Sequence, residues 1–451
     1  MEMVKDAFRA KLIKLVIPLT VQFFLLCLVP VSDAVMLVSL DQDAMSAVSL
    51  AAQVAFVLQL FNFAITSGTS MFAAQFWGKG DKDSIEELYA FCIRLSLPIS
   101  VVFFLVTFFA PSWVMRLFTS ESAIIEYGVG YLKVAAFSYL MIGTILVIET
   151  VMKNTELVKP VTVISSATVF VNIGLNAVFI YGLLGAPKMG PAGAALATMI
   201  SYAVSLVGSV IVQRRAGGIR FRMKYFFHVS EGLRREYIKY TSPVLANQLS
   251  WGIGFTMISV IMGHLGSDAV AANSIVAVVK DLISCFCFAL SSGGAILVGN
   301  ELGAGKTEPA KQYGSRLCKL GLYSGIIAGV IIAASSPVIV RVVSITPAAK
   351  HYLQIMLLMC IYYMVGRSMN SVVISGIFCA GGDTRFGFIC DTVTMWAFIV
   401  PVGALAAFVF KLPVLWVFFI INLDEIVKLP VVYKHYKKYL WLKDLTAETS
   451  D

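Results

Sequence analysis

The chain has 451 residues, of which 59% are hydrophobic and 14% are charged. This composition lies far outside that of soluble domains, so the sequence predicts an integral membrane protein without a sizeable soluble domain. The formal net charge of +9 does not indicate binding to nucleic acid, because the basic residues lie in loops between hydrophobic segments.

The hydrophobic segments predict an all-α membrane protein with twelve transmembrane helices. The predicted spans are 15–40, 46–77, 88–113, 125–152, 160–183, 190–212, 240–263, 269–300, 320–340, 352–380, 386–410 and 413–433. Because twelve is an even number, both termini are expected on the same side of the membrane.

The basic residues predict which side that is. With both termini in the cytoplasm, 25 of the 35 Lys and Arg residues fall in inner segments, five in outer segments and five within spans. Inner loops of membrane proteins carry such an excess of positive charge. The sequence therefore predicts a multi-pass protein of the plasma membrane with both termini in the cytoplasm.

The first predicted span carries one charged residue, Asp33, in an otherwise uncharged stretch from Leu15 to Leu40. Asp33 lies eight residues before Asp41, which places it about 12 Å inside the outer end of the helix. A carboxylate at such a depth is costly and usually faces a bundle interior, where it handles ions or protons. A structural carboxylate satisfied by hydroxyl groups or by arginine is the alternative.

An internal repeat is visible at an offset of 225 residues. Pro18 aligns with Pro243, and the segments LDQDA and SGTSMFAAQFWGKG align with LGSDA and SGGAILVGNELGAG. Since the offset spans six helices, the copies enter the membrane from the same side, and the sequence predicts two parallel-topology six-helix repeats.

This repeat divides the chain into three expected parts. They are an N-terminal lobe at 1–212, a basic cytoplasmic linker at 213–239 and a C-terminal lobe with a short cytoplasmic tail at 240–451. The linker either anchors the topology or binds anionic lipid.

Four segments carry a family resemblance: SDAVMLVSLDQDAMSAVSLA, SGTSMFAAQFWGKGD, NIGLNAVFIYGLLGAPKMGPAGAALATMIS and GHLGSDAVAANSI. Together they resemble the MATE (multidrug and toxic compound extrusion) family, and the similarity extends over 15–435. The resemblance implies a V-shaped pair of six-helix bundles. It also implies an antiporter, driven by Na⁺ or H⁺, that exports amphipathic and often cationic small molecules. The coupling ion is the only cofactor expected, and a monomer is the expected state.

Carried over residue by residue, the resemblance implies a cation site at Asp33, Asn172, Asn176 and Thr198. Asn172 and Asn176 are four residues apart, so they share one face of a helix that is otherwise apolar. Oxygen ligands suit a hard cation such as Na⁺, whereas a desolvated carboxylate can take a proton instead. Hydrogen bonding between helices is the structural alternative for the two amides.

Two departures from the family pattern bear on the coupling ion. Many relatives carry a second carboxylate where Asn176 stands, and the amide leaves both sodium and proton open. Some branches also use a carboxylate on the seventh helix, where this chain offers only Asn247 and Gln248. Coupling through the C-terminal half is therefore a weaker hypothesis.

Other charged residues within the predicted spans are candidates for a cavity or a secondary proton site: Asp391, Arg367, Lys280 and Asp281. Asp391 and Arg367 could pair across helices, because unpaired burial of either is costly, or they could handle substrate or protons. Lys280 and Asp281 are adjacent, so their side chains diverge by about 100° and need separate partners.

Two further pairs of charged residues are spaced four apart near inner helix ends. They are Glu149 with Lys153 and Asp424 with Lys428, and each pair is predicted to interact.

The main functional alternative is a lipid-linked saccharide flippase, which would hold pyrophosphate in an arginine-rich cavity. Only Arg367, Lys280 and Lys133 are candidates for that role. A membrane enzyme would need a nucleophile–base set or a metal cluster within the spans, and none is found. The sequence therefore predicts a transporter in the lipid bilayer that acts on drugs or metabolites and not an enzyme.

Overall fold

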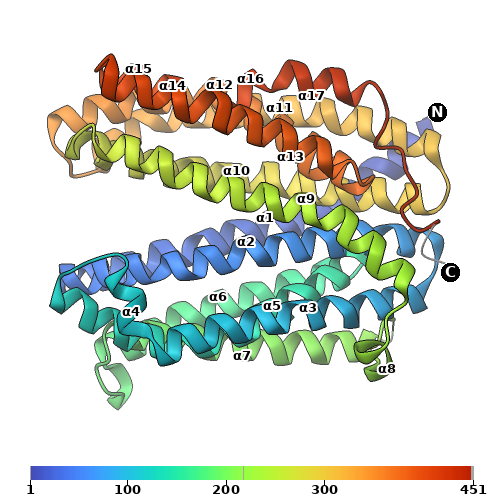
Figure 1. The fold of residues 1–451 in the computed structure, drawn as a ribbon, viewed down its shortest axis with the longest axis horizontal. Coiled ribbons are helices and arrows are strands. Elements are labelled where there is room, and N and C mark those ends of the chain that lie inside the picture. The colour runs from blue at the N-terminus through green and yellow to red at the C-terminus, as the bar shows by residue number, and fades with distance from the viewer. Residues whose placement is uncertain (1, 217, 448–451) are drawn as a thin grey trace. The chain divides into compact units, whose positions relative to one another are not determined.

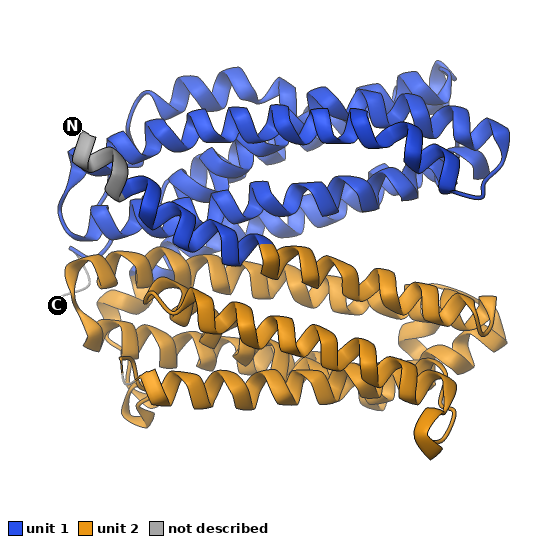
Figure 2. Cartoon of the chain, turned by 180° about the vertical axis from the view of Figure 1, so that it is seen from behind, with its two compact units in different colours: residues 1–20, 236–448 blue, residues 21–235, 449–451 orange. Residues whose placement is uncertain are grey.

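The structure is a computed structural model that describes residues 2–216 and 218–447. Its regular elements are helices, and these described residues contain no strand (Figure 1). By their contacts the described residues form two compact units (Figure 2). Unit 1 contains the chain up to Thr20 and from Glu236 onward, and unit 2 contains Val21–Arg235.

Helix α1 (Glu2–Val38) begins in unit 1 and ends in unit 2. The other helices of unit 2 are α2 (Gln42–Lys79), α3 (Lys82–Phe109), α4 (Pro111–Arg116), α5 (Ser122–Asn154), α6 (Val158–Tyr181), η1 (Leu183–Gly185), α7 (Pro191–Ala216) and α8 (Met223–Phe227).

Helix α9 (Glu231–Gly263) opens the second half of the chain. It is followed in unit 1 by α10 (Ser267–Gly303), α11 (Thr307–Val342), α12 (Pro347–Asn370), η2 (Ser371–Phe378), α13 (Thr384–Val393), η3 (Thr394–Ile399), α14 (Val400–Ala404), η4 (Leu405–Val409), α15 (Val414–Ile421), α16 (Asp424–Val427) and α17 (Leu429–Tyr436). The segments η2, η3 and η4 are π-helical turns inside longer helices.

Eleven helices in the described part of the chain are long and apolar enough to cross a membrane. They coincide with the first eleven predicted spans, which confirms the predicted all-helical membrane fold. Continuous helices over Pro347–Phe378 and Thr384–Val409 join α12 to η2 and α13 to η4.

The twelfth predicted span, 413–433, is helical but is broken into α15, α16 and α17, so the prediction of one continuous helix was wrong. The first break follows Asn422, whose side-chain Nδ2 donates to the carbonyl of Phe418 at 2.8 Å. The second break is at Lys428, two residues before Pro430, which has no amide hydrogen to continue the helical ladder.

The predicted repeat is confirmed by the positions of the helix ends. Helices α2, α3 and α5 begin at Gln42, Lys82 and Ser122, and their counterparts α10, α11 and α12 begin 225 residues later in each case. Gly80 and Gly305, which the offset aligns, both have left-handed backbones with φ of +80° and +71°. Glycine adopts this conformation without steric cost, which allows a long helix to end in a tight turn.

Helix α11 begins at Thr307, well before the predicted start at 320, because its first turns have an apolar stripe to bury. Tyr313 and Leu317 are buried on this stripe, and the Tyr313 ring lies 4.7 Å from that of Phe8 on α1. A Cβ added at Gly314 would come within 2.8 Å of the Trp441 ring, so the C-terminal tail packs directly on this turn. Packing on both sides therefore extends the helix beyond the apolar span.

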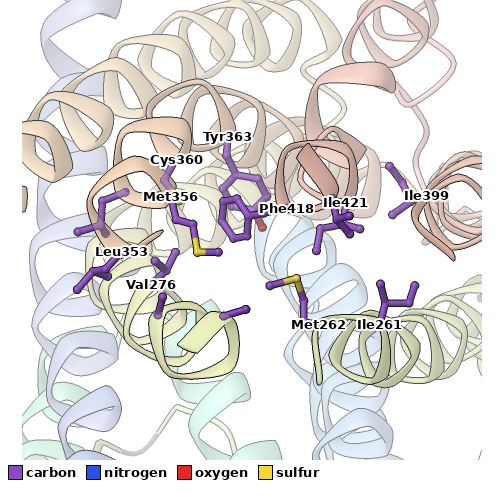
Figure 3. Packing of buried hydrophobic residues seen from close by; sticks show 14 of the residues in the cluster. Ile261, Met262, Val276, Leu353, Met356, Cys360, Tyr363, Ile399, Phe418 and Ile421 are labelled. Carbon is purple, nitrogen blue, oxygen red and sulfur yellow. The ribbon is translucent and has the colours of Figure 1, made fainter. Parts of the chain in front are cut away.

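The core of unit 1 is a cluster of aliphatic, sulfur-containing and aromatic side chains (Figure 3). It includes Ile261, Met262, Val276, Leu353, Met356, Cys360, Tyr363, Ile399, Phe418 and Ile421, contributed by α9, α10, α12, η3 and α15. Because lipid is as apolar as these side chains, close packing and polar contacts between helices hold the bundle together.

Candidate functional site

The four predicted ion-site residues lie in unit 2 and form one continuous chain of hydrogen bonds. Asn176 Nδ2 on α6 donates to Asp33 Oδ1 on α1 at 2.5 Å and to Asn172 Oδ1 at 3.2 Å. Asn172 Nδ2 donates to Thr198 Oγ1 on α7 at 3.2 Å. The structure thus brings together side chains from three helices that are distant in sequence.

Helix geometry and close backbone packing position these groups. Asn172 and Asn176 lie one turn apart on the same face of α6. The start of α7 approaches α6 so closely that a Cβ at Gly193 would lie 2.6 Å from the Phe179 carbonyl oxygen. Because glycine permits this approach, Thr198 on α7 reaches the polar face of α6.

Burial makes the polar groups of this cluster energetically important. Asn172 is 3% exposed and Asn176 is 0% exposed, while Asp33 and Thr198 are half-buried. Within the described residues, the Asn176 Oδ1 atom is buried without a hydrogen-bond partner. An unpaired buried acceptor of this kind costs about 1–3 kcal/mol, and an incoming cation or donor would relieve that cost.

The donor set of this cluster is one carboxylate, two amide oxygens and one hydroxyl. Such oxygen ligands suit a hard cation, and the single negative charge of Asp33 balances that of a monovalent ion. A 180° rotation of the Asn176 amide exchanges the positions of its nitrogen and oxygen. In one orientation the nitrogen donates to the Asp33 carboxylate, and in the other the oxygen can bind a cation. The residues present therefore fit a coupling ion.

Two tyrosines near this cluster were not identified from the sequence. The side chains of Tyr131 on α5 and Tyr202 on α7 both interact electrostatically with the Asp33 carboxylate. Tyr202 follows Thr198 by four residues and therefore shares its helix face, a spacing that could have indicated it. No comparable signal in the sequence pointed to Tyr131.

A second polar cluster in unit 2 joins α1, α5 and α6. Gln22 Nε2 donates to Glu149 Oε2 at 3.2 Å and to Ser165 Oγ at 2.8 Å, and Ser165 Oγ donates to Glu149 Oε1 at 3.2 Å. The predicted pairing of Glu149 with Lys153 is confirmed, with 3.8 Å between Lys153 Nζ and Glu149 Oε2.

In unit 1 the candidates Asp391 and Arg367 do not pair with each other, so that prediction was wrong. Lys428 Nζ contacts Asp391 Oδ1 at 3.0 Å, and Arg367 NH1 contacts Glu425 Oε1 at 3.3 Å. Lys428 also contacts Glu425 Oε2 at 3.1 Å, which links the two pairs. On its own segment Lys428 makes its direct contact with Glu425, and it also interacts electrostatically with the predicted partner, Asp424.

Lys280 and Asp281 take separate partners, as predicted from their adjacency. Lys280 Nζ donates to Asn422 Oδ1 at 3.1 Å and lies 4.3 Å from the centre of the Tyr363 ring. Asp281 is exposed and interacts electrostatically with Arg367. These two residues lie in unit 1, whereas the Asp33 cluster lies in unit 2.

A repeated bundle of long apolar helices that encloses a carboxylate and amide cluster is characteristic of a secondary transporter. The MatE family model matches residues 18–178 and 243–421. The chain therefore belongs to the MatE family, which confirms the resemblance seen in the sequence and makes it a multi-pass membrane protein.

Curated relatives match along almost the whole chain. The uncharacterized transporter YisQ of Bacillus subtilis is 24% identical over 419 residues, which cover 91% of this chain and 90% of the relative. The multidrug resistance protein MdtK of Photorhabdus laumondii is 25% identical and covers 87% of this chain and 86% of its own.

Solved structures show the same fold at low sequence identity. A mutant of the Vibrio cholerae MATE transporter VcmN matches with a TM-score of 0.88 at 14% identity and covers 98% of this chain and 99% of its own. A MOP superfamily transporter from Pyrococcus furiosus matches with a TM-score of 0.87 at 17% identity and covers 95% of each chain.

Proposed function

We propose that this chain is a cation-coupled antiporter that exports amphipathic, often cationic, small molecules, with Asp33 as the carboxylate that binds the coupling ion. Na⁺ or H⁺ drives the exchange. The relatives named multidrug resistance proteins support the substrate class. The observation that carries the proposal is the buried chain of hydrogen bonds from Asp33 through Asn176 and Asn172 to Thr198.

This cluster couples ion and substrate by favouring one conformation of the protein. An ion that binds one state more tightly shifts the protein toward that state, and a substrate that prefers the other state is released in exchange. One elementary charge moved through 100 mV supplies about 2.3 kcal/mol, which sustains a substrate gradient of about 50-fold.

A lipid-linked saccharide flippase is not favoured by the contacts of the basic residues. A pyrophosphate group would require cations that are available for binding. Arg367 instead contacts Glu425 at 3.3 Å, and Lys280 donates to Asn422 at 3.1 Å. Both charges are therefore engaged within the protein.

The unit of function is a monomer in the plasma membrane with both termini in the cytoplasm. All four cluster residues come from one unit of one chain, so a second copy is not needed to complete the site. The excess of Lys and Arg in the inner segments supports this orientation. The proposal includes no enzymatic activity.

Transport in proteoliposomes tests this function. The purified protein would be reconstituted with ethidium as the transported cation, and Na⁺ and pH gradients would be imposed separately. We expect Asp33→Asn to abolish efflux driven by either gradient, because the amide cannot exchange an ion. Ethidium exchange without a gradient should persist, since it does not need the coupling ion.

The matched control is Asp43→Asn, which removes an acid from the first turn of α2 at the outer end. It should transport like the unaltered protein. Undiminished gradient-driven efflux in Asp33→Asn would refute the role assigned to this carboxylate.

A further inference from the structure

The basic linker between the two halves of the chain is folded onto helix α3 of unit 2. The backbone amide of Arg220 donates to Glu86 Oε1 at 2.8 Å, and the backbone amide of Ser230 donates to Glu87 Oε1. Between these two points the linker forms the short helix α8. Since both hydrogen bonds end on adjacent acids of α3, segment 220–230 is a loop whose two ends are fixed side by side.

The tip of this loop reaches the level at which α3 enters the membrane. Arg94 NH1 donates to the backbone carbonyls of Phe226 and Phe227, each at 3.3 Å. Side chains on a helix lean toward its N-terminus, so this guanidinium lies about one turn before its own Cα, near residue 90. The predicted apolar span of α3 begins at 88, and the acids that hold the ends of the loop precede it. The loop therefore runs from the polar end of α3 to the membrane boundary.

The tip leaves two large apolar side chains exposed. Met223 is 61% exposed and Phe227 is 65% exposed. Phe221 instead attaches the loop, because its ring packs edge-on against Tyr89 of α3 at 5.6 Å and lies 6.2 Å from the half-buried Phe226. Exposed apolar side chains at a membrane boundary are covered by lipid.

The same loop carries positive charge. Residues 214–230 contain five Lys or Arg and no Asp or Glu. Arg222 pairs with two acids of α3 and so helps to hold the loop in place. Arg220 and Lys224 are exposed. Lys224 Nζ lies 5.6 Å from the centre of the neighbouring Tyr225 ring, a contact that leaves the three donors of the ammonium available.

We propose that segment 220–230 is a membrane-surface site that binds the headgroups of anionic phospholipids in the leaflet on the linker side, which is the inner leaflet in the proposed orientation. Met223 and Phe227 enter the boundary between headgroups and acyl chains. Arg220 and Lys224 contact the headgroup phosphates. This inference goes beyond the proposed transport function and does not depend on it.

Position, charge and rigidity together favour lipid over a soluble partner. Interfacial segments bind through buried apolar area and through attraction to anionic lipid, and this loop offers both at the membrane boundary. Each Lys or Arg near an anionic surface contributes about a five-fold preference, so two contribute about 25-fold. Because backbone hydrogen bonds already fix the ends of the loop, little conformational freedom is lost when lipid binds. A soluble acidic protein would have to reach Phe227 beside the membrane span.

A fluorescent label beside the tip measures whether the loop lies at the membrane. The label is bimane on a cysteine introduced by His228→Cys, an exposed position that leaves Phe227 unaltered. The native cysteines of the described residues are buried or half-buried. The half-buried ones, Cys27 and Cys379, would be replaced by alanine in every variant, so that the introduced thiol is the one that reacts.

Lipid nanodiscs expose both membrane faces to the same solution and hold the full chain. In nanodiscs of phosphatidylcholine with phosphatidylglycerol, we expect the label to be quenched by acyl-brominated lipid and shielded from aqueous iodide. The control label is at Thr307→Cys, an exposed position thirteen residues, about 20 Å of helix, before the predicted span 320–340. It should be quenched by iodide and not by brominated lipid.

Headgroup selectivity is measured by comparing brominated phosphatidylglycerol with brominated phosphatidylcholine at the same mole fraction. With the linker otherwise unaltered, we expect phosphatidylglycerol to be preferred at least about five-fold at the label. Arg220→Gln combined with Lys224→Gln should lower this preference at least about five-fold, while the backbone hydrogen bonds and the pairs of Arg222 keep the loop on α3. Raising the salt to about 1 M should also abolish the preference, because the Debye length falls to about 3 Å.

The matched control is Arg116→Gln combined with Lys188→Gln, which removes two exposed cations from predicted outer segments and should leave the preference unchanged. Equal quenching by the two brominated lipids would show membrane contact without headgroup selection and would overturn the proposal. A label that is open to iodide would place the loop in water, and a label shielded from iodide but quenched by neither lipid would indicate a covering protein. Either result overturns the proposal as well. None of these measurements involves transport, so they are independent of the test of the proposed function.

Discussion

Lys428 holds together the charge network of unit 1, and its replacement by methionine should be strongly destabilising. The ammonium contacts Asp391 at 3.0 Å and Glu425 at 3.1 Å. Without it, Glu425 keeps the guanidinium of Arg367 at 3.3 Å. Asp391 keeps only the Asn247 amide within the described residues, at 2.9 Å. Asp391 is therefore the charge left uncompensated.

The size of the effect follows from this burial. The side chains of Lys428 and Asp391 are 10% and 21% exposed, so water replaces little of the lost interaction. Breaking a buried pair by removing one partner typically costs about 3–5 kcal/mol, much of it from the charge left behind. Adding Asp391→Asn to Lys428→Met should recover at least about 1.5 kcal/mol of that cost. Adding Glu425→Gln should recover less, because Arg367 still balances Glu425.

Thermal unfolding of the purified protein in detergent, followed by tryptophan fluorescence, measures this ranking. The set contains the unaltered protein, Lys428→Met, Asp391→Asn, Glu425→Gln and the two double variants. Each kilocalorie should displace the melting temperature by a few degrees, about 2–4 °C for chains of some 200 residues. Strict additivity, or a larger rescue by Glu425→Gln than by Asp391→Asn, would refute the reasoning.

Two further predictions concern close packing in unit 1. Gly366→Ala places a Cβ 2.8 Å from the backbone oxygen of Glu425, so this overpacking should lower the free energy of unfolding by about 1–3 kcal/mol. The control is Gly130→Ala, whose Cβ meets nothing within 4 Å, and it should leave the melting temperature unchanged in the same assay. Trp441→Ala removes a fully buried ring that lies against Gly314 and should cost about 3–5 kcal/mol. Unchanged melting of either variant would contradict the packing described for these turns.

The presence and approximate positions of the first eleven spans could be predicted, because long apolar segments and a repeat offset constrain each other. Once Asp43 is aligned with Asp268, the starts of α10, α11 and α12 follow from those of α2, α3 and α5. The juxtaposition of Asn172 and Asn176 also follows from their helical spacing. Their proximity to Asp33 came from the family resemblance, because periodicity within one helix does not specify which helices are neighbours.

The charge pairing of unit 1 could not be predicted, because it depends on which helices are neighbours. A continuous helix over 413–433 would place Asp424 and Lys428 one turn apart on the same face. Glu425 is three residues from Lys428 and shares that face as well, and Lys428 also contacts Asp391 of α13, which spacing within one helix does not indicate. Tyr202 was missed for a related reason, since an aromatic residue in an apolar helix looks like ordinary packing.

The offset of 225 residues also bears on stoichiometry. The positions that correspond to Asp33, Asn172, Asn176 and Thr198 are Ile258, Ala397, Pro401 and Leu423. Duplication of the scaffold has therefore not duplicated the ligand set, and the second copy lacks any oxygen-bearing side chain at those four places. Under the proposed function, we therefore expect one ion at the Asp33 centre for each substrate molecule moved.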